Sequence, residues 1–247
     1  MAKKVRIYHL IPVANGIESW GKVTRELQEV IASPDVEIIL ADLPNAPVKE
    51  IMCAYDAALV APLCVREAMK AEREGYDAVI IDCLSDPGVS AAKEALDIPV
   101  VGDLEAVLHY ASLVGRRFSL LLPGSTTGRM LGADASRDME DLVRMYGFKS
   151  KLASMRSVPA NCLEFAGQDP ELPEAMLEQA QRAIEDDGAD SIICYGGIDV
   201  VTHLQEHLKI PVIDSVQSST MLAESLIRLR ISQSKRAFPK PLGLLIE

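Results

Sequence analysis

The chain has 247 residues, of which 49% are hydrophobic and 25% charged, and its formal net charge is −11. This composition is typical of a folded globular protein, and the length allows one or two domains. An acidic chain without a basic amphipathic helix argues against nucleic acid and membrane surfaces as partners.

The elements expected from the residue pattern alternate along the whole chain, in the order strand then helix. The expected strands are Val5–Ile11, Val36–Ala41, Ala78–Ile81, Val100–Val101, Phe118–Leu122, Leu152–Val158, Ser191–Ile193 and Val212–Ile213. The expected helices are Glu18–Ile31, Ile51–Glu74, Val89–Ala95, Leu104–Val114, Met130–Tyr146, Leu172–Asp187, Val200–His207 and Val216–Ile231. The strands are short and lack polar alternation, which is typical of parallel sheets buried on both faces.

The N-terminal segment, the longest apolar run and the cysteines indicate in which cellular compartment the protein is expected. Lys3 and Lys4 precede an apolar stretch, but Arg6 and His9 interrupt it, so a first strand explains it better than a signal peptide. The longest apolar run, 57–65, is too short to span a bilayer. Five cysteines without a C-x-x-C pair indicate neither a disulfide framework nor a cysteine zinc site. We therefore expect a cytoplasmic protein with reduced thiols.

A repeated segment divides the chain into two halves. The first copy runs from Gly75 to Cys83 and on to Ile98-Pro-Val-Val-Gly-Asp103. The second runs from Gly188 to Cys194 and on to Ile210-Pro-Val-Ile-Asp214. The proline follows the cysteine by 16 residues in the first copy and by 17 in the second.

From this repeat we expect an α/β fold with one half at 1–114 and another at 115–214. The last helix, about 215–232, is expected to pack back on the first half. The tail, 233–247, either docks on the body of the protein or reaches a neighbouring subunit, and the sequence does not decide between these.

Cys83 and Cys194 are the candidate catalytic residues, because each ends a predicted strand before a turn and a helix. Ligands of parallel sheets bind at these strand ends, and a helix N-terminus lowers a cysteine pKa. The residues around them are candidates for substrate binding: Ser85, Asp86, Pro87 and Gly88 after the first cysteine, and Tyr195, Gly196 and Gly197 after the second. Asp86 or Ser85 is expected to cap the helix that follows, and Gly88 to let the backbone approach a ligand. The alternative is that buried cysteines are simply small hydrophobic residues.

Three other features have competing explanations. His203-Leu-Gln-Glu-His207 matches a zinc-binding pattern, with Glu224 as a third ligand, or is a solvated helix face. The Gly124–Gly128 turn, with Ser125 and Thr126, either holds a carboxylate or imide group or is an ordinary turn. Cys53 and Cys64 are expected to share one face of a helix and pack in the core, and Cys162 to lie in a loop.

The segments Tyr76–Ala106 and Gly188–Val216 resemble the Asp/Glu/hydantoin racemase superfamily, and within it the hydantoin and allantoin racemase branch. The likeness is strongest at Asp-Cys83-Leu-Ser-Asp-Pro-Gly and at the two Ile-Pro-Val segments. It implies two pseudo-symmetric flavodoxin-like halves with parallel sheets and an active site in the cleft between them. Family analogy also implies a homo-oligomer, a small-molecule substrate, and no metal or other cofactor.

The sequence departs from this branch at several ligand-facing positions. The branch has Asn-Pro-Asn after its first strand, where this chain has Ile11-Pro12-Val13 with Asn15 nearby, so Pro12 and Asn15 are expected to bind substrate. It has Gly-Cys-x-Gly-Met at the second cysteine, where this chain has Ile-Cys194-Tyr-Gly-Gly. A threonine common after the central strand is Pro123 here.

The resemblance implies a racemase or epimerase acting at a carbon next to a carbonyl, with a 5-substituted hydantoin or related amino-acid derivative as substrate. One of Cys83 and Cys194 would remove the proton and the other would return it on the opposite face. Two alternatives stay open: an enzyme like the maleate isomerases, with one nucleophilic cysteine, and a binding protein that has lost the chemistry.

Overall fold

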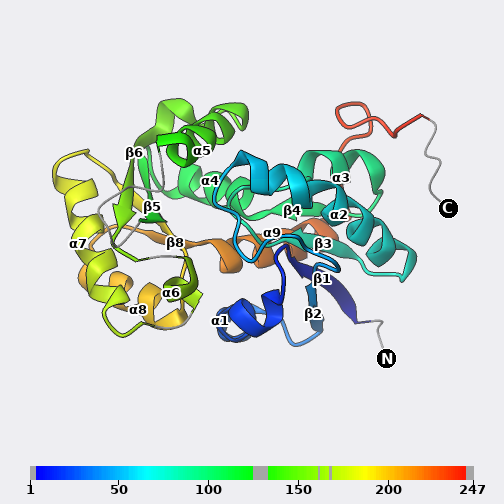
Figure 1. Cartoon of the computed structure of the whole chain (residues 1–247), viewed down its shortest axis with the longest axis horizontal. Coiled ribbons are helices and arrows are strands. Elements are labelled where there is room, and N and C mark those ends of the chain that lie inside the picture. The colour runs from blue at the N-terminus through cyan, green and yellow to red at the C-terminus, as the bar shows by residue number, and fades with distance from the viewer. Residues whose placement is uncertain (1–3, 125–132, 161, 167–168, 243–247) are drawn as a thin grey trace.

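The computed structural model describes residues 4–124, 133–160, 162–166 and 169–242. The described part of the chain contains two parallel sheets of four strands each, with helices packed against them (Figure 1). This is the α/β architecture of two flavodoxin-like halves that was predicted. Within these residues, no helix is both long enough and apolar enough to cross a membrane.

The first sheet has the strand order β2-β1-β3-β4. Its strands are β1 (Val5–Ile11), β2 (Val36–Asp42), β3 (Ala78–Ile81) and β4 (Val100–Gly102). All four residues of β3 are buried, because helices cover both faces of the sheet. The carboxyl ends of β1, β3 and β4 lie side by side, since Leu10 pairs with Ile81 and Ile81 with Gly102.

The second sheet repeats this order as β6-β5-β7-β8. Its strands are β5 (Phe118–Pro123), β6 (Leu152–Val158), β7 (Ser191–Cys194) and β8 (Val212–Asp214). The register pairs Ile193 with Ile213 and Cys194 with Asp214 at the end of β7.

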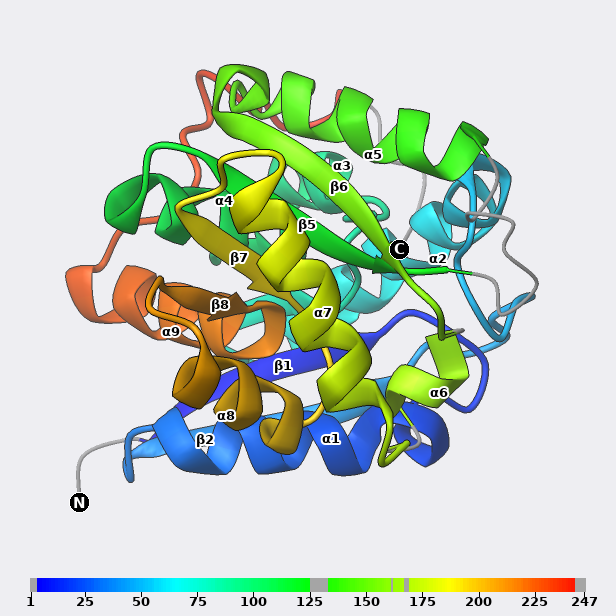
Figure 2. The same cartoon turned by 90° about the vertical axis from the view of Figure 1, so that its left-hand side faces the viewer.

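The helices cover the sheets in the order that the alternating pattern predicts. They are α1 (Gly16–Ile31), α2 (Ala54–Arg73), α3 (Val89–Ala95), α4 (Asp103–Val114), α5 (Ala133–Met145), α6 (Cys162–Ala166), α7 (Leu172–Glu185), α8 (Ile198–His207) and α9 (Ser215–Leu229). A short 3₁₀ turn, Lys149–Lys151, precedes β6. Helix α6 replaces the loop predicted around Cys162. Figure 2 shows α7 in front of the second sheet and α1 below β1.

Helix α4 joins the halves by contributing to both cores. Ala106 packs with Ile7, Ile80 and Ala223, whereas Leu104 and Leu108 pack with Phe118 and Ile193. Helix α1 also links the halves, because it follows β1 of the first sheet and its Leu27 belongs to the core of the second half. Both helices therefore hold the two halves together.

The last helix and the tail both contact the first half. Ala223 of α9 is buried against the β1 and β3 side chains Ile7 and Ile80. In the tail, the Gln233 amide donates hydrogen bonds to the carbonyls of Leu96 and Ile98 at 2.8 Å, beside the edge strand β4. The described part of the tail thus docks on the body of the protein.

Candidate active site

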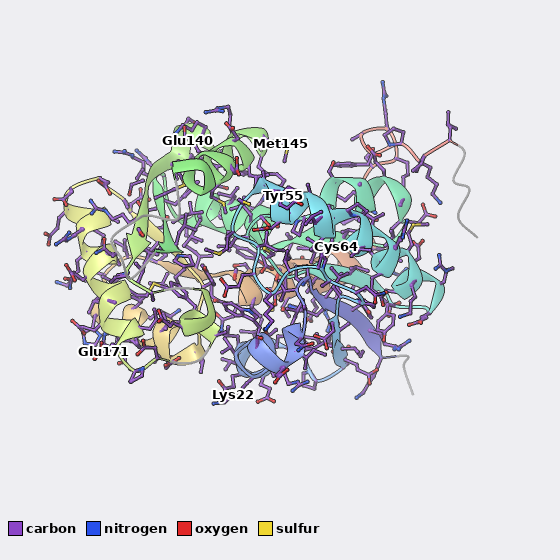
Figure 3. The ribbon with its side chains drawn as sticks, viewed as in Figure 1. Lys22, Tyr55, Cys64, Glu140, Met145 and Glu171 are labelled. Carbon is purple, nitrogen blue, oxygen red and sulfur yellow. The ribbon has the colours of Figure 1, made fainter. Side chains whose placement is uncertain are left out.

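A cavity of about 440 Å³ lies between the two halves. The first half contributes Ile11, Pro12, Val13, Trp20, residues 49–54, Ala57, residues 82–85 and Asp103 to its wall. The second half contributes Leu122, Pro123, Asp138, Met139, Asp141, Leu142, Met145 and Tyr195, and Ser215 at the start of α9 also belongs to the wall. Figure 3 shows Tyr55 and Met145, from α2 and α5, on the same side of the molecule. Strand ends from both sheets therefore face one space.

Cys83 lies in this wall, directly beyond the end of β3. Its Sγ atom is 3.1 Å from the Ser85 Oγ atom, which also lines the cavity. Burial raises the pKa of Cys83 to about 12, and the Ser85 hydroxyl and backbone amide oppose this rise. The predicted lowering of the Cys83 pKa by a helix N-terminus is therefore wrong, because desolvation dominates at this position.

Asp86 is not among the described residues that line the cavity. It supports the loop that carries Cys83. Its carboxylate accepts hydrogen bonds from the backbone amides of Leu104 and Glu105 at 3.0 and 2.9 Å, and from the Tyr146 hydroxyl at 2.7 Å. Asp86 thus caps α4, a helix distant in sequence, and not α3 as the sequence suggested. Burial raises the pKa of Asp86 to about 7 against these hydrogen bonds.

Two neighbours of Asp86 also serve packing rather than ligand contact. Pro87 is buried and, like Gly88, does not belong to the described cavity wall. A Cβ atom at Gly88 would lie 2.7 Å from the carbonyl oxygen of Ala61. Glycine is needed here because the loop packs against the α2 backbone, which corrects the expectation that it approaches a ligand.

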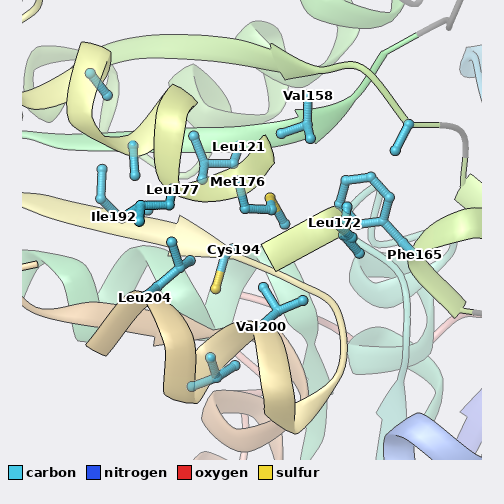
Figure 4. Close-up of a cluster of buried hydrophobic side chains, with 14 of the residues drawn as sticks. Leu121, Val158, Phe165, Leu172, Met176, Leu177, Ile192, Cys194, Val200 and Leu204 are labelled. Atoms are coloured by element: carbon cyan, nitrogen blue, oxygen red, sulfur yellow. The ribbon is translucent and has the colours of Figure 1, made fainter. Parts of the chain in front are cut away.

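Cys194 is the main correction to the sequence prediction. Its side chain is 0% exposed and packs among Met176, Val200 and Leu204 between β7, α7 and α8 (Figure 4). Burial raises its pKa well above the ordinary value. Within the described residues it is not part of the cavity wall, so the structure does not bring the two predicted thiols together.

The register of the two sheets explains why. Asp77 and Asp190 are equivalent, since each carboxylate accepts the amide of an arginine (Arg6, Arg117) at the start of the central strand. Cys83 lies six residues after Asp77, and six residues after Asp190 lies Gly196. Cys194 is instead the equivalent of Ile81, a core residue of the strand. Counting from the Gly-x-Asp of each repeat would have revealed this in the sequence.

Tyr195 is the residue beyond β7 that lines the cavity. Its ring stacks on Phe165, with centroids 4.7 Å apart, and lies 6.1 Å from the Trp20 ring. Gly196 and Gly197 do not belong to the described wall. The second half therefore contributes a tyrosine to the cavity wall where a second cysteine was predicted.

Of the other residues considered in the sequence, some line the cavity and others do not. Pro12 lines the cavity, whereas Asn15 is exposed at the start of α1, outside the described wall. Ser125 and Thr126 lie outside the described residues. Cys64 is buried in the first core as expected, but Cys53 precedes α2 and lines the cavity.

A buried chain of polar side chains lies beside Cys83 and was not predicted from the sequence. Asp82 and Asp103 both line the cavity, and their carboxyl groups share a hydrogen bond. The His9 ring bonds Asp82 at 2.8 Å, and Gln28 bonds the other ring nitrogen at 2.9 Å. The available signal in the sequence was Asp82, a charged residue directly after the apolar strand β3.

This chain of contacts separates the two carboxyl groups electrostatically. Burial alone would raise the pKa of Asp82, but His9 and the hydrogen bonds from Asp103 and Thr24 lower it. Burial and the Asp82 charge raise the pKa of Asp103 well above its ordinary value. The pKa values of the two carboxyl groups are therefore shifted in opposite directions, downward for Asp82 and upward for Asp103.

The histidine pattern on α8 has local partners. His203 pairs with Glu174 at 3.3 Å, and His207 bonds the carbonyl of His203 at 2.8 Å. Glu224 is engaged by Ser33 and Arg228. Within the described residues, no group of three His, Cys, Asp or Glu side chains has the placement of a metal site.

The fold and this cavity define a class: an α/β enzyme with its site between two similar halves. The family described as Asp/Glu/Hydantoin racemase matches residues 17–223. The chain is 35% identical over 207 residues to a hydantoin racemase of Pseudomonas sp. (strain NS671), covering 83% of this chain and 79% of that one. It is 34% identical over 218 residues to a hydantoin racemase of Paenarthrobacter aurescens, covering 87% and 88%. An allantoin racemase from Klebsiella pneumoniae superposes with a TM-score of 0.84 at 26% identity, covering 99% of this chain and 96% of that one.

The chain belongs to the Asp/Glu/hydantoin racemase family. It is a racemase similar to the hydantoin racemases, and the resemblance inferred from its sequence motifs is confirmed.

Proposed function

We propose that the protein racemises 5-substituted hydantoins or related cyclic amino-acid derivatives by proton transfer to and from Cys83. The observation that carries this proposal is the position of Cys83, a thiol in the wall of a cavity that both halves enclose. Trp20, Met139 and Leu142 form an apolar part of the cavity wall, against which the substituent at the reacting carbon would pack.

Cys83 in its thiolate form would take the C5 proton of the substrate, leaving a planar enolate. The carbonyl next to C5 delocalises the negative charge, so the ring itself supplies the stabilisation that a cofactor would provide. A hydrogen bond from the Ser85 hydroxyl to Sγ would stabilise the thiolate. A basic thiol suits this step, because a raised pKa strengthens the base once it is deprotonated.

Inversion needs a proton donor on the other face of the enolate. We infer that the Tyr195 hydroxyl supplies it, because Tyr195 lines the cavity from the second half, next to the position equivalent to Cys83. In one direction the thiolate is protonated and the phenol deprotonated, and in the other direction these roles reverse. This replaces the two-cysteine mechanism, which requires Cys194 in the cavity.

Deuterium exchange separates these roles. The protein is incubated in D₂O with each enantiomer of 5-substituted hydantoins, with allantoin, and with aspartate and glutamate, and both exchange at the reacting carbon and inversion are followed. Tyr195→Phe keeps the ring stacking on Phe165, and we expect it to exchange the enantiomer that presents its proton to Cys83 but to invert neither. Absence of exchange with every compound in the wild type would refute the proposed function. A covalent adduct on Cys83 in intact-mass spectra would point to the nucleophilic alternative.

A further inference from the structure

The carboxyl group of Asp103 is placed to contact a bound substrate. It follows the end of β4, next to the end of β3 that leads to Cys83, and both residues belong to the cavity wall. The side chain is 1% exposed, and its Oδ1 atom receives no hydrogen bond from any donor in the described part of the chain. A buried acceptor without a donor is costly, and a ligand that supplies the donor removes the cost.

The surroundings fix the protonation of Asp103. Two carboxyl groups form a hydrogen bond only if one of them carries a proton. Asp82 is bonded to His9 at 2.8 Å and to Thr24 at 3.4 Å, so Asp82 is the ionised partner and Asp103 donates to it. The oxygen of Asp103 that does not face Asp82 is then a neutral acceptor, with the character of an amide oxygen.

We propose that this oxygen of Asp103 accepts a hydrogen bond from the ring N–H next to the reacting carbon, and that Asp103 thereby selects cyclic ureides. The inference rests on the proposed function, because it assumes that the ring binds with its reacting carbon at Cys83. The N1 atom of a hydantoin is bonded to that carbon, and Asp103 occupies the strand end beside Cys83. A site built to hydrogen-bond an N–H group rejects analogues that lack it far more strongly than an apolar wall could.

Two variants of Asp103 separate its hydrogen-bonding role from its size. Asp103→Asn supplies an N–H group that donates to Asp82 and a carbonyl oxygen that accepts from the ring, so it reproduces the protonated carboxyl group. Asp103→Leu has a similar size and neither function. Asp214→Asn is the matched control, because Asp214 is a buried carboxyl group outside the described cavity wall.

The test measures kcat and KM for a 5-substituted hydantoin, for its N1-methyl derivative, and for the oxazolidine-2,4-dione in which oxygen replaces N1–H. Wild type and Asp103→Asn are expected to prefer the hydantoin over the dione by roughly 100-fold or more in kcat/KM. In Asp103→Leu the KM for the hydantoin should rise roughly 10- to 100-fold and the preference should fall towards one.

The outcomes are distinct. Exchange of the hydantoin by the wild type without discrimination against the dione would overturn the role of Asp103 but leave the proposed function intact. An Asp103→Asn variant as impaired as Asp103→Leu, with Asp214→Asn active, would also overturn it, since it would show that an ionisable carboxyl group is required. If Asp103→Leu does not fold, the wild-type comparison of the three compounds still decides. Lack of exchange with all three would refute the proposed function itself.

Discussion

Asp86 is the residue whose loss should most damage the support of the catalytic loop. It accepts hydrogen bonds from two backbone amides at the start of α4 and from the Tyr146 hydroxyl. Removing a carboxylate cap from a helix costs about 0.5–2 kcal/mol, and leaving the partly buried Tyr146 hydroxyl without its partner costs about 1–3 kcal/mol. Asp86→Ala should therefore lower the free energy of unfolding by about 1.5–5 kcal/mol.

The measurement is urea unfolding followed by far-UV circular dichroism and by the fluorescence of Trp20, the single tryptophan. Tyr146→Phe removes only the hydroxyl group and should cost about 1–2 kcal/mol, and the double mutant should cost less than the sum of the two. Because Asp86 has a positive φ of 45°, Asp86→Asn, which tolerates this backbone, controls for local strain. A loss below about 0.5 kcal/mol in Asp86→Ala would refute the view that Asp86 joins the Cys83 loop to α4.

Three further predictions follow from the described contacts. Ser85→Ala should raise the pKa of Cys83 further and lower kcat/KM by roughly tenfold, with the pH–rate profile moved to higher pH; an unchanged profile would show that the hydroxyl does not stabilise the thiolate. Alkylation of Cys83 by iodoacetamide, followed by peptide mass spectrometry, should accelerate roughly tenfold per pH unit from pH 7 to 10, because only the thiolate reacts; a plateau below pH 9 would contradict the raised pKa. Burial raises the pKa of both Asp86 and Asp214 to about 7, so the folded state binds more protons than the unfolded state between about pH 4 and 7, and the free energy of unfolding should fall as the pH rises through this window. Asp86→Asn with Asp214→Asn should flatten that dependence, and an equally steep dependence in the double variant would contradict the assignment.

The strands were largely predictable because their signal is local. Val5–Ile11, Ala78–Ile81 and Leu152–Val158 were predicted with the bounds that the structure has. Only Ala78–Ile81 is wholly apolar, as a strand covered on both faces requires; the other two are short, mainly apolar segments between predicted helices. The start of α2 was placed three residues early. The missed signal was Asp56, whose carboxylate binds the amide of Met52 and the thiol of Cys53 and so fixes the chain before the helix.

The site was only partly predictable, because strand order creates it. Cys83, Ser85 and Tyr195 were identified because they follow predicted strands, and Pro12 was identified from the resemblance to the hydantoin branch; all four line the cavity. Asp103 was not, because its approach to Cys83 depends on the pairing of β3 with β4.

Cys194 was chosen because the two repeats were aligned on their cysteines. The backbone hydrogen bonds align them on Asp77 and Asp190 instead. Asp77 connects the start of β3 to the start of β1, and Asp190 connects the start of β7 to the start of β5. A repeat in sequence therefore located the two strand ends correctly, but it assigned the wrong residue to one of them.

The most direct test of this account compares two single variants under one assay. Cys83→Ala and Cys194→Ala are each checked for folding by circular dichroism and then given, in D₂O, the enantiomer of a 5-substituted hydantoin that Tyr195→Phe still exchanges, because that enantiomer presents its proton to Cys83. We predict that Cys83→Ala loses both exchange and inversion of this enantiomer, while Cys194→Ala, altered only in the packed core, stays within about twofold of the wild type. A folded Cys194→Ala that no longer inverts the substrate, or a Cys83→Ala that still does, would contradict it.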